Sequence, residues 1–184
     1  MWWTRRRRIQ RMHRDLERRC SALVGEVLES VRYVEGDYAE PEWNRVADYD
    51  SVDFGVELCM HSRQTFALMW DYAPVDFAMN LVVGAVPVIE GVPRLDVSAT
   101  SRWSSLIGQT VTECGVVWRP IEGTRDEVNS QTIRLVFDNH GRVLVTASEF
   151  GANAPWGAEH VTVFFDDDWE RRSDLTADIH PSLD

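Results

Sequence analysis

Two stretches of the chain alternate apolar and polar residues around a polar tetrapeptide. Residues 56–70 read VELCMHSRQTFALMW and residues 133–147 read IRLVFDNHGRVLVTA. Alternation with a period of two on both sides of a short polar segment is typical of a β-hairpin. The second tetrapeptide ends in Gly141, which can adopt a positive φ, whereas the first contains no glycine. We therefore expect two hairpins, the second with the stronger turn.

The hairpins belong to a longer internal repeat. Residues 21–34 read SALVGEVLESVRYV and residues 104–117 read SSLIGQTVTECGVV, so a serine, a leucine, a β-branched residue and a glycine recur in register. Each copy continues through a long loop, the hairpin, a second loop and a last apolar run, at 77–83 and at 161–165. Because four short strands alone leave an apolar face and open edges, the repeat predicts two units that pack together.

We therefore expect an α+β, β-rich protein, with an N-terminal helix followed by a tandem duplication of a small antiparallel β-unit. The duplicated units should form two packed sheets or a pseudo-twofold barrel. The connector contains the breakers Pro87, Gly91 and Pro93 and should hold a short edge strand at Arg94–Val97. The predicted boundaries are 1–19 for the arginine-rich helix, 20–83 for the first β-unit, 84–102 for the connector, 103–165 for the second β-unit and 166–184 for an acidic tail.

The repeated Leu-Val-Gly and Leu-Ile-Gly triplets should lie where the two units meet. Gly25 and Gly108 should occupy equivalent positions at the start of the first strand of each copy. A glycine at the same place twice suggests a positive φ or the close approach of another backbone. The apolar members of the triplets should be buried near the pseudo-twofold axis: Leu23, Val24, Leu106 and Ile107.

The first 20 residues differ in charge from the rest of the chain. Ile9, Met12, Leu16 and Cys20 are spaced three and four apart, which predicts one narrow apolar stripe on an arginine-rich helix capped by Thr4. Eight arginines against two carboxylates give this segment a net charge of +6, whereas 11 arginines against 28 carboxylates give the remainder −17. The helix can dock on this acidic body or on a twin chain, bind nucleic acid, or lie on an anionic membrane surface. The charge contrast favours docking on protein.

Composition narrows the broad class of the protein. No apolar run approaches the length of a membrane span, and no apolar segment follows the basic start, so we expect neither a transmembrane segment nor a secretory signal. The three cysteines are widely spaced without a CxxC motif, which predicts reduced thiols and a cytoplasmic location. All 19 basic residues are arginine, as in proteins of GC-rich bacterial genomes. The acidic body argues against non-specific nucleic-acid binding, and suits either a basic partner or solubility alone.

Motifs that would carry chemistry are scarce. The sequence contains no GxSxG, GxGxxG, HExxH or phosphate-binding glycine loop, so we expect a protein that is not an enzyme and that uses neither cofactor nor metal. Two features of the sequence are nevertheless compatible with a ligand site. His61 and His140 both fall in the predicted hairpin turns. Asp166, Asp167 and Asp168 follow the last strand and could hold a hard cation, although three consecutive carboxylates rarely converge.

The candidate binding surface is the segment at 35–51, EGDYAEPEWNRVADYDS, which interleaves carboxylates with aromatic residues. Its counterpart at 119–131 has no aromatic residue. Carboxylates would steer a cationic partner, and the aromatic rings would supply contact area. The alternative is a solubilising loop whose aromatic residues fold back on the core. Together with Trp156 in a later loop, the predicted partner-binding residues are Glu35, Asp37, Tyr38, Glu40, Glu42, Trp43, Asp48, Tyr49, Asp50 and Trp156.

The twin openings LVGEVL and LIGQTV, each followed by an apolar hairpin, resemble small β-rich actinobacterial proteins, several of which are similar to immunity proteins of bacterial polymorphic toxin systems. The resemblance covers residues 20–165 in pattern and assigns no functional residue. It implies a non-enzymatic inhibitor that blocks a toxin or effector by binding it. The alternatives are a structural or accessory subunit of a bacterial assembly that docks through the arginine-rich helix, and an enzyme with dispersed active-site residues. A homo-oligomer is compatible with either binding role.

Overall fold

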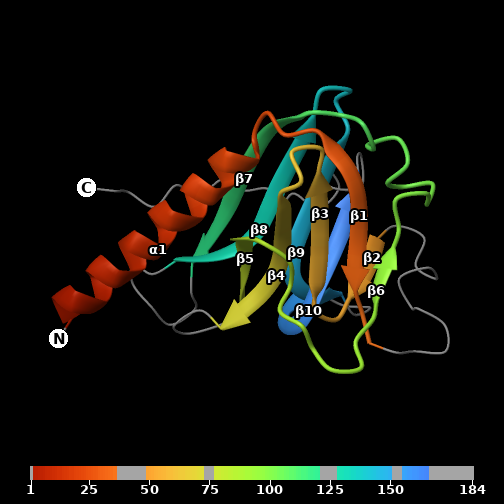
Figure 1. Ribbon diagram of the computed structural model, residues 1–184. Helices are drawn as coiled ribbons and strands as arrows, with labels where there is room; N and C mark the ends of the chain where they lie inside the picture. Colours follow the sequence, from red (N-terminus) through yellow and green to blue (C-terminus); the bar gives the residue numbers. More distant parts are fainter. Residues whose placement is uncertain (1, 37–48, 73–76, 121–127, 151–154, 166–184) are drawn as a thin grey trace.

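The computed structural model describes residues 2–36, 49–72, 77–120, 128–150 and 155–165, with only the backbone described at 2–9, 72, 77, 119–120, 129, 148–150 and 155–159. One helix, α1 (Trp2–Leu23), precedes two antiparallel five-stranded sheets that pack together (Figure 1). The first sheet contains, in spatial order, β5 (Phe77–Val83), β4 (Thr65–Tyr72), β3 (Gly55–Met60), β1 (Leu28–Val34) and β6 (Arg94–Asp96). The second contains β2 (Tyr49–Val52), β10 (Pro155–Phe165), β9 (Arg142–Phe150), β8 (Val128–Phe137) and β7 (Val111–Pro120). The predicted β-rich α+β class is confirmed.

Both sheets are built on the same four-strand unit. The order β5-β4-β3-β1 in the first sheet repeats as β10-β9-β8-β7 in the second, and in each unit the hairpin follows the first strand. The strand predicted in the connector is present as β6, which pairs with β1. β2 lies in the first copy of the sequence but pairs with β10 of the second sheet. This exchange connects the two units through main-chain hydrogen bonds.

Reciprocal hydrogen bonds join the two units at the repeated glycines. The Gly25 N–H donates to the carbonyl of Val111 at 2.8 Å, and the Gly108 N–H donates to the carbonyl of Leu28 at 2.8 Å. Such an exchange of bonds between matched residues is what a local twofold relation requires. Both glycines have a positive φ, 91° and 81°, as predicted. The alternative reason, the close approach of another backbone, does not hold, because a Cβ added at either position would meet nothing within 4 Å.

Alanine at Gly108 should lower the free energy of unfolding by about 1 kcal/mol, because an L residue is strained at this positive φ. Gly25→Ala should have the same effect at the matched position. Gly115→Ala in β7 is the control, because a Cβ there would lie 3.8 Å from its nearest neighbour, an ordinary contact. Urea unfolding of the three variants measures the difference. Equal stability of Gly108→Ala and Gly115→Ala would remove the backbone explanation.

One apolar core is shared by α1 and both sheets, so the two units do not form separate domains. Leu23 and Leu106 are buried in it, as predicted, and Ile107 packs partly against it. The prediction for Val24 is wrong, since this residue is 44% exposed. α1 ends at Leu23, four residues beyond the predicted boundary, and the chain then turns at Gly25. Val24 therefore lies in the turn, facing solvent.

The helix α1 docks on the sheets of its own chain. α1 contacts β7 and β5, and between residues 10 and 23 its buried residues are Leu16, Cys20, Leu23 and His13, whose ring centroid lies 4.0 Å from that of Trp118. Met12, which was predicted to lie on the docking stripe, is 40% exposed, and the side chain of Ile9 is outside the described part. Figure 1 shows the N-terminal end of α1 extending away from the sheets. No helix among the described residues is long and apolar enough to cross a membrane.

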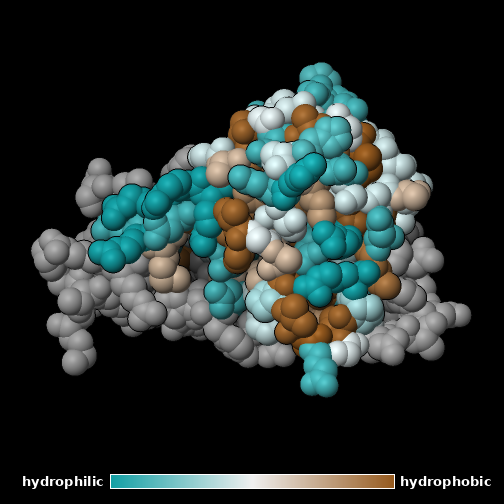
Figure 2. All heavy atoms as spheres, viewed as in Figure 1, coloured by the Kyte–Doolittle hydropathy of each residue, from teal (hydrophilic) through white to brown (hydrophobic). Residues whose placement is uncertain are grey.

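The connector crosses the outer face of the first sheet before it reaches β6 (Figure 1). A second, smaller apolar cluster forms beneath it from Val34, Ala67 and Val86. Figure 2 shows apolar surface gathered on this face, and Val88 in the connector is 88% exposed. The connector thus covers part of the outer face of this sheet, a side that often faces solvent in an antiparallel sheet.

Candidate functional site

A buried polar network connects the two sheets where the segment at 35–51 returns to the core. The Tyr33 hydroxyl, on β1, donates to Asp50 Oδ2, on β2, at 2.6 Å. Trp103 Nε1 donates to the Tyr33 oxygen at 2.7 Å, and Arg102 Nη1 donates to Asp50 Oδ1. Because β1 and β2 belong to different sheets, this network fixes one end of the segment to both of them.

Burial sets the protonation behaviour of this network. Loss of hydration raises the pKa of Asp50, while the hydrogen bond from Tyr33 and the charge of Arg102 act in the opposite direction. Burial and the neighbouring Asp50 carboxylate raise the pKa of Tyr33 well above its ordinary value, so the phenol remains the donor. The arrangement stabilises one conformation of the backbone and leaves the carboxylate with two partners.

A second set of contacts holds the other end of the same segment. Glu35 is buried, and its Oε2 accepts a hydrogen bond from the Asp53 N–H at 3.2 Å. Asp53 Oδ2 in turn accepts from the Gly36 N–H at 3.2 Å, and Asp53 Oδ1 lies 3.6 Å from Nδ1 of His160 on β10. The described backbone on either side of residues 37–48 is therefore held by hydrogen bonds. We call the five side chains that hold these ends the loop clamp: Tyr33, Glu35, Asp50, Asp53 and Arg102.

The structure corrects part of the predicted binding surface. Glu35 and Asp50 were expected to face a partner, but both are buried and bonded within the loop clamp. Tyr49 packs on Phe164 with ring centroids 5.5 Å apart, so the alternative of an aromatic residue folded back on the core holds for this position. Trp156 is in β10, but its side chain lies outside the described part. Also outside the described residues are Asp37, Tyr38, Glu40, Glu42, Trp43 and Asp48.

Sequence reasoning missed Arg102 and Trp103, although the repeat contains a signal for them. Extending the match by two residues toward the N-terminus aligns them with Arg19 and Cys20. Cys20 is buried against β7, and Trp103 occupies the corresponding place against β1 through its bond to Tyr33. The core role of Cys20 therefore predicts that of Trp103, but the bonded partners of Arg102 do not follow from the match.

Arg102→Gln should lower the free energy of unfolding by about 2 kcal/mol near neutral pH, because Asp50 loses its buried counterion. Burial raises the pKa of Asp50 above its ordinary 3.8, so in acid the folded state takes up this proton before the unfolded state does. The penalty should therefore shrink as the pH falls through the folded pKa of Asp50. Urea unfolding from neutral pH to about pH 4 measures it. In an Asp50→Asn background, adding Arg102→Gln should cost the same free energy of unfolding at every pH. With Asp50 present, a penalty that does not change with pH would contradict this role.

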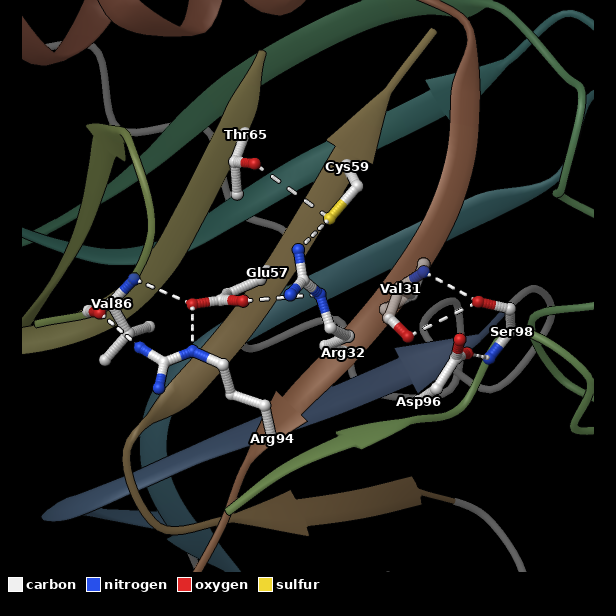
Figure 3. A network of polar contacts seen from close by, with 9 residues as sticks. All are labelled: Val31, Arg32, Glu57, Cys59, Thr65, Val86, Arg94, Asp96 and Ser98. Atoms are coloured by element: carbon white, nitrogen blue, oxygen red, sulfur yellow. Dashed lines mark hydrogen bonds and ion pairs between the residues drawn. The ribbon is translucent and has the colours of Figure 1, made fainter. Parts of the chain in front are cut away.

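Another buried carboxylate, that of Glu57, lies on the outer face of the first sheet, beneath the connector (Figure 3). Glu57 is 0% exposed, and its Oε1 accepts hydrogen bonds from the Val86 N–H and from Arg94 Nε, both at 3.0 Å. Arg32 Nε lies 3.5 Å from its Oε2, and Arg94 Nη2 also donates to the Val86 carbonyl at 2.6 Å. The carboxylate thus fastens the connector to the sheet, which is a structural role.

Arg32 also contacts the thiol of Cys59 on the neighbouring strand. Its Nη2 lies 2.8 Å from Cys59 Sγ, and this hydrogen bond is the largest cause of the raised pKa of Arg32 (Figure 3). The guanidinium is shared between Cys59 and Glu57. The group therefore holds β1 and β3 together across their outer face.

The other ligand candidates gain no support from the described residues. His61 and His140 are exposed in their hairpin turns, as predicted. Within the described ranges, no group of three or more histidine, cysteine or acidic residues is arranged to hold a metal ion. Asp166, Asp167 and Asp168 lie outside those ranges.

The chain matches no family model, no curated protein and no solved structure. The geometry of the site is therefore what bears on function.

Proposed function

We propose that the protein is a non-enzymatic binding protein, an immunity-type inhibitor that blocks a bacterial toxin or effector in the cytoplasm. The observation that carries this proposal is the loop clamp. The buried side chains of Tyr33, Glu35 and Asp50 hold the backbone on both sides of the segment 37–48 through hydrogen bonds. Ends that are already fixed reduce the conformational entropy lost when a loop binds, which is how a rigid scaffold favours recognition.

The charge of the segment favours a basic partner. With Glu35 and Asp50 occupied inside the protein, the carboxylates left for contact are Asp37, Glu40, Glu42 and Asp48, accompanied by Tyr38 and Trp43. A toxin that acts on nucleic acid needs a cationic groove for the phosphate backbone. Carboxylates placed across such a groove mimic phosphates and exclude the substrate. The remaining chain, with a net charge of −17 beyond the first 20 residues, adds long-range attraction.

Trp43→Ala should weaken binding to the partner by about 2 kcal/mol or more, because aromatic anchors carry most of the affinity of an interface. Affinity of the wild type should also fall as salt rises, because ion pairs mainly accelerate encounter. Titration calorimetry at low and high salt measures both effects. Glu113→Gln is the control, because this exposed carboxylate is on β7, at the edge of the second sheet opposite β2. Tight binding that ignores both salt and Trp43 would place the interface elsewhere.

A second candidate function is that of an accessory subunit of a bacterial assembly, and one observation favours it. Arg11, Arg14 and Arg18 are exposed, and their spacing of three and four places them on one face of α1. The docked residues, among them Leu16 and Cys20, lie on the opposite face. Replacing the three arginines with glutamine keeps the helix propensity and leaves the docked face intact. Loss of partner binding in this variant, with normal binding by Trp43→Ala, would select the assembly role over the inhibitor role.

A further inference from the structure

The connector carries an apolar tip on the face of the first sheet that Figure 2 shows. Val88 is 88% exposed, more than any other large apolar residue of the described chain, and Pro87 beside it is exposed as well. We call Pro87, Val88 and Ile89 the connector tip. A single exposed valine is common in soluble proteins and needs no explanation by itself. This one differs because hydrogen bonds hold the backbone on both sides of it.

A buried ion pair fixes the chain just before the connector tip (Figure 3). The Val86 N–H donates to Glu57 Oε1 at 3.0 Å, and the Val86 carbonyl accepts from Arg94 Nη2 at 2.6 Å. Glu57 is fully buried, and burial of a carboxylate costs free energy even when a counterion accompanies it. An apolar side chain at position 57 would cover the sheet without this cost. What the carboxylate adds is a fixed position for the Val86 backbone.

The chain after the connector tip is fixed to the loop clamp. The Val92 N–H donates to the Ile89 carbonyl at 3.2 Å, which closes a turn. The Pro93 carbonyl then accepts a hydrogen bond from the N–H of Glu35, a member of the loop clamp, at 3.5 Å. Val92 also packs against the small cluster that contains Val34, the residue before Glu35. The connector tip and the segment 37–48 are therefore anchored on the same part of the first sheet.

We propose that the connector tip is a second contact of the partner-binding surface, and that it inserts into an apolar pocket beside the basic groove of the partner. This inference rests on the proposed function and extends it, since the acidic segment 37–48 meets the groove while Val88 meets the pocket. Val88 lies five positions before Pro93, so its backbone is within about 18 Å of the bond to Glu35. An interface of ordinary size, about 800 Å² on each side, covers both contacts. Because the tip is already fixed, little conformational entropy is lost when it binds.

The charge around the connector tip favours a basic partner over a second copy of the chain. Glu90 follows the tip and is exposed, and the carboxylates of segment 37–48 belong to the same surface. A twofold dimer through Val88 would place each of these groups against its own equivalent, and like charges across an interface repel. A basic protein with an apolar pocket meets the same surface without this repulsion.

Val88→Ser should weaken binding about tenfold, the effect expected when a valine that is buried on binding loses its apolar side chain. The probe is the basic protein that the wild type retains from its native host, purified and titrated by calorimetry. Val24→Ser is the control, because Val24 is also exposed but precedes the start of β1, whereas Glu35 follows its end. Both variants should keep the melting temperature and the salt dependence of the wild type, since neither changes the core or the charge.

Photo-crosslinking tests the contact directly. The change Val88→p-benzoylphenylalanine should give a crosslink to an apolar stretch of the same basic protein, and Val24→p-benzoylphenylalanine should give none. Wild-type affinity in Val88→Ser, with binding still weakened by Trp43→Ala, would overturn the role of the connector tip and leave the proposed function standing. Crosslinks from position 88 to a second copy of the chain would assign the tip to self-association instead. A wild type that retains no basic protein would remove the proposed function and this inference together.

Discussion

Replacing Arg94 with methionine should lower the free energy of unfolding by about 3 to 5 kcal/mol, since removing one partner of a buried ion pair leaves an uncompensated charge. Glu57 is fully buried beneath the connector, and Arg94 supplies its closest charged contact, with Nε 3.0 Å from Oε1. Methionine retains most of the apolar stem, so the loss reports on charge and hydrogen bonding. Urea unfolding of the purified variant measures it.

Two further variants isolate the cause. Adding Glu57→Gln to Arg94→Met removes the buried charge and should restore a large part of the lost stability. Arg63→Met, at an exposed arginine in the first hairpin turn, should stay within about 0.5 kcal/mol of the wild type. A cost of Arg94→Met no greater than that of Arg63→Met would mean that Arg32, at 3.5 Å, compensates Glu57 alone.

Trp103→Ala should cost about 3 to 5 kcal/mol, the range for truncating a large aromatic residue in a core. Trp103 is fully buried, its ring meets that of Phe165 edge to face with centroids 5.0 Å apart, and its Nε1 donates to Tyr33. The substitution leaves a cavity and removes a hydrogen bond from the loop clamp. It should therefore weaken partner binding as well as folding, because the fixed end of the segment loosens.

Chemical denaturation followed by circular dichroism measures the loss at Trp103. Trp103→Phe keeps most of the ring volume and removes only the indole donor, so it should cost about 1 to 2 kcal/mol. If the alanine variant is as stable as the phenylalanine variant, the ring does not fill the space between the two units as described.

Most of the fold could be predicted from the internal repeat. The alternation at 56–70 and 133–147 predicted the two hairpins because the period of two is a local property of a strand with one buried face. The glycines at 25 and 108 predicted a positive φ because glycine readily adopts this backbone conformation, which is also a local property. β2 could not be predicted, because it has only four residues and pairs with β10, more than 100 positions later in the chain.

The candidate site was harder to predict because burial of a carboxylate depends on distant partners. Glu35 and Asp50 appear in the sequence among other acidic residues, which favours a solvent-facing interpretation. Asp50 is buried because Tyr33 and Arg102 satisfy it, and Arg102 lies 52 positions away. Glu57 is buried because the connector covers the outer face of the first sheet, which the alternation of residues around it does not reveal.

The proposed function requires that the segment 37–48 binds a basic partner and inhibits it. The most direct measurement captures partners from the native host with tagged wild type and with a variant carrying Trp43→Ala and amides at Asp37, Glu40 and Glu42, then assays the captured protein. We predict a basic protein that is retained by the wild type and lost by the variant, and whose activity is suppressed by an equimolar amount of the wild type. Equal retention by both forms, or a captured protein whose activity the wild type leaves unchanged, would contradict the account.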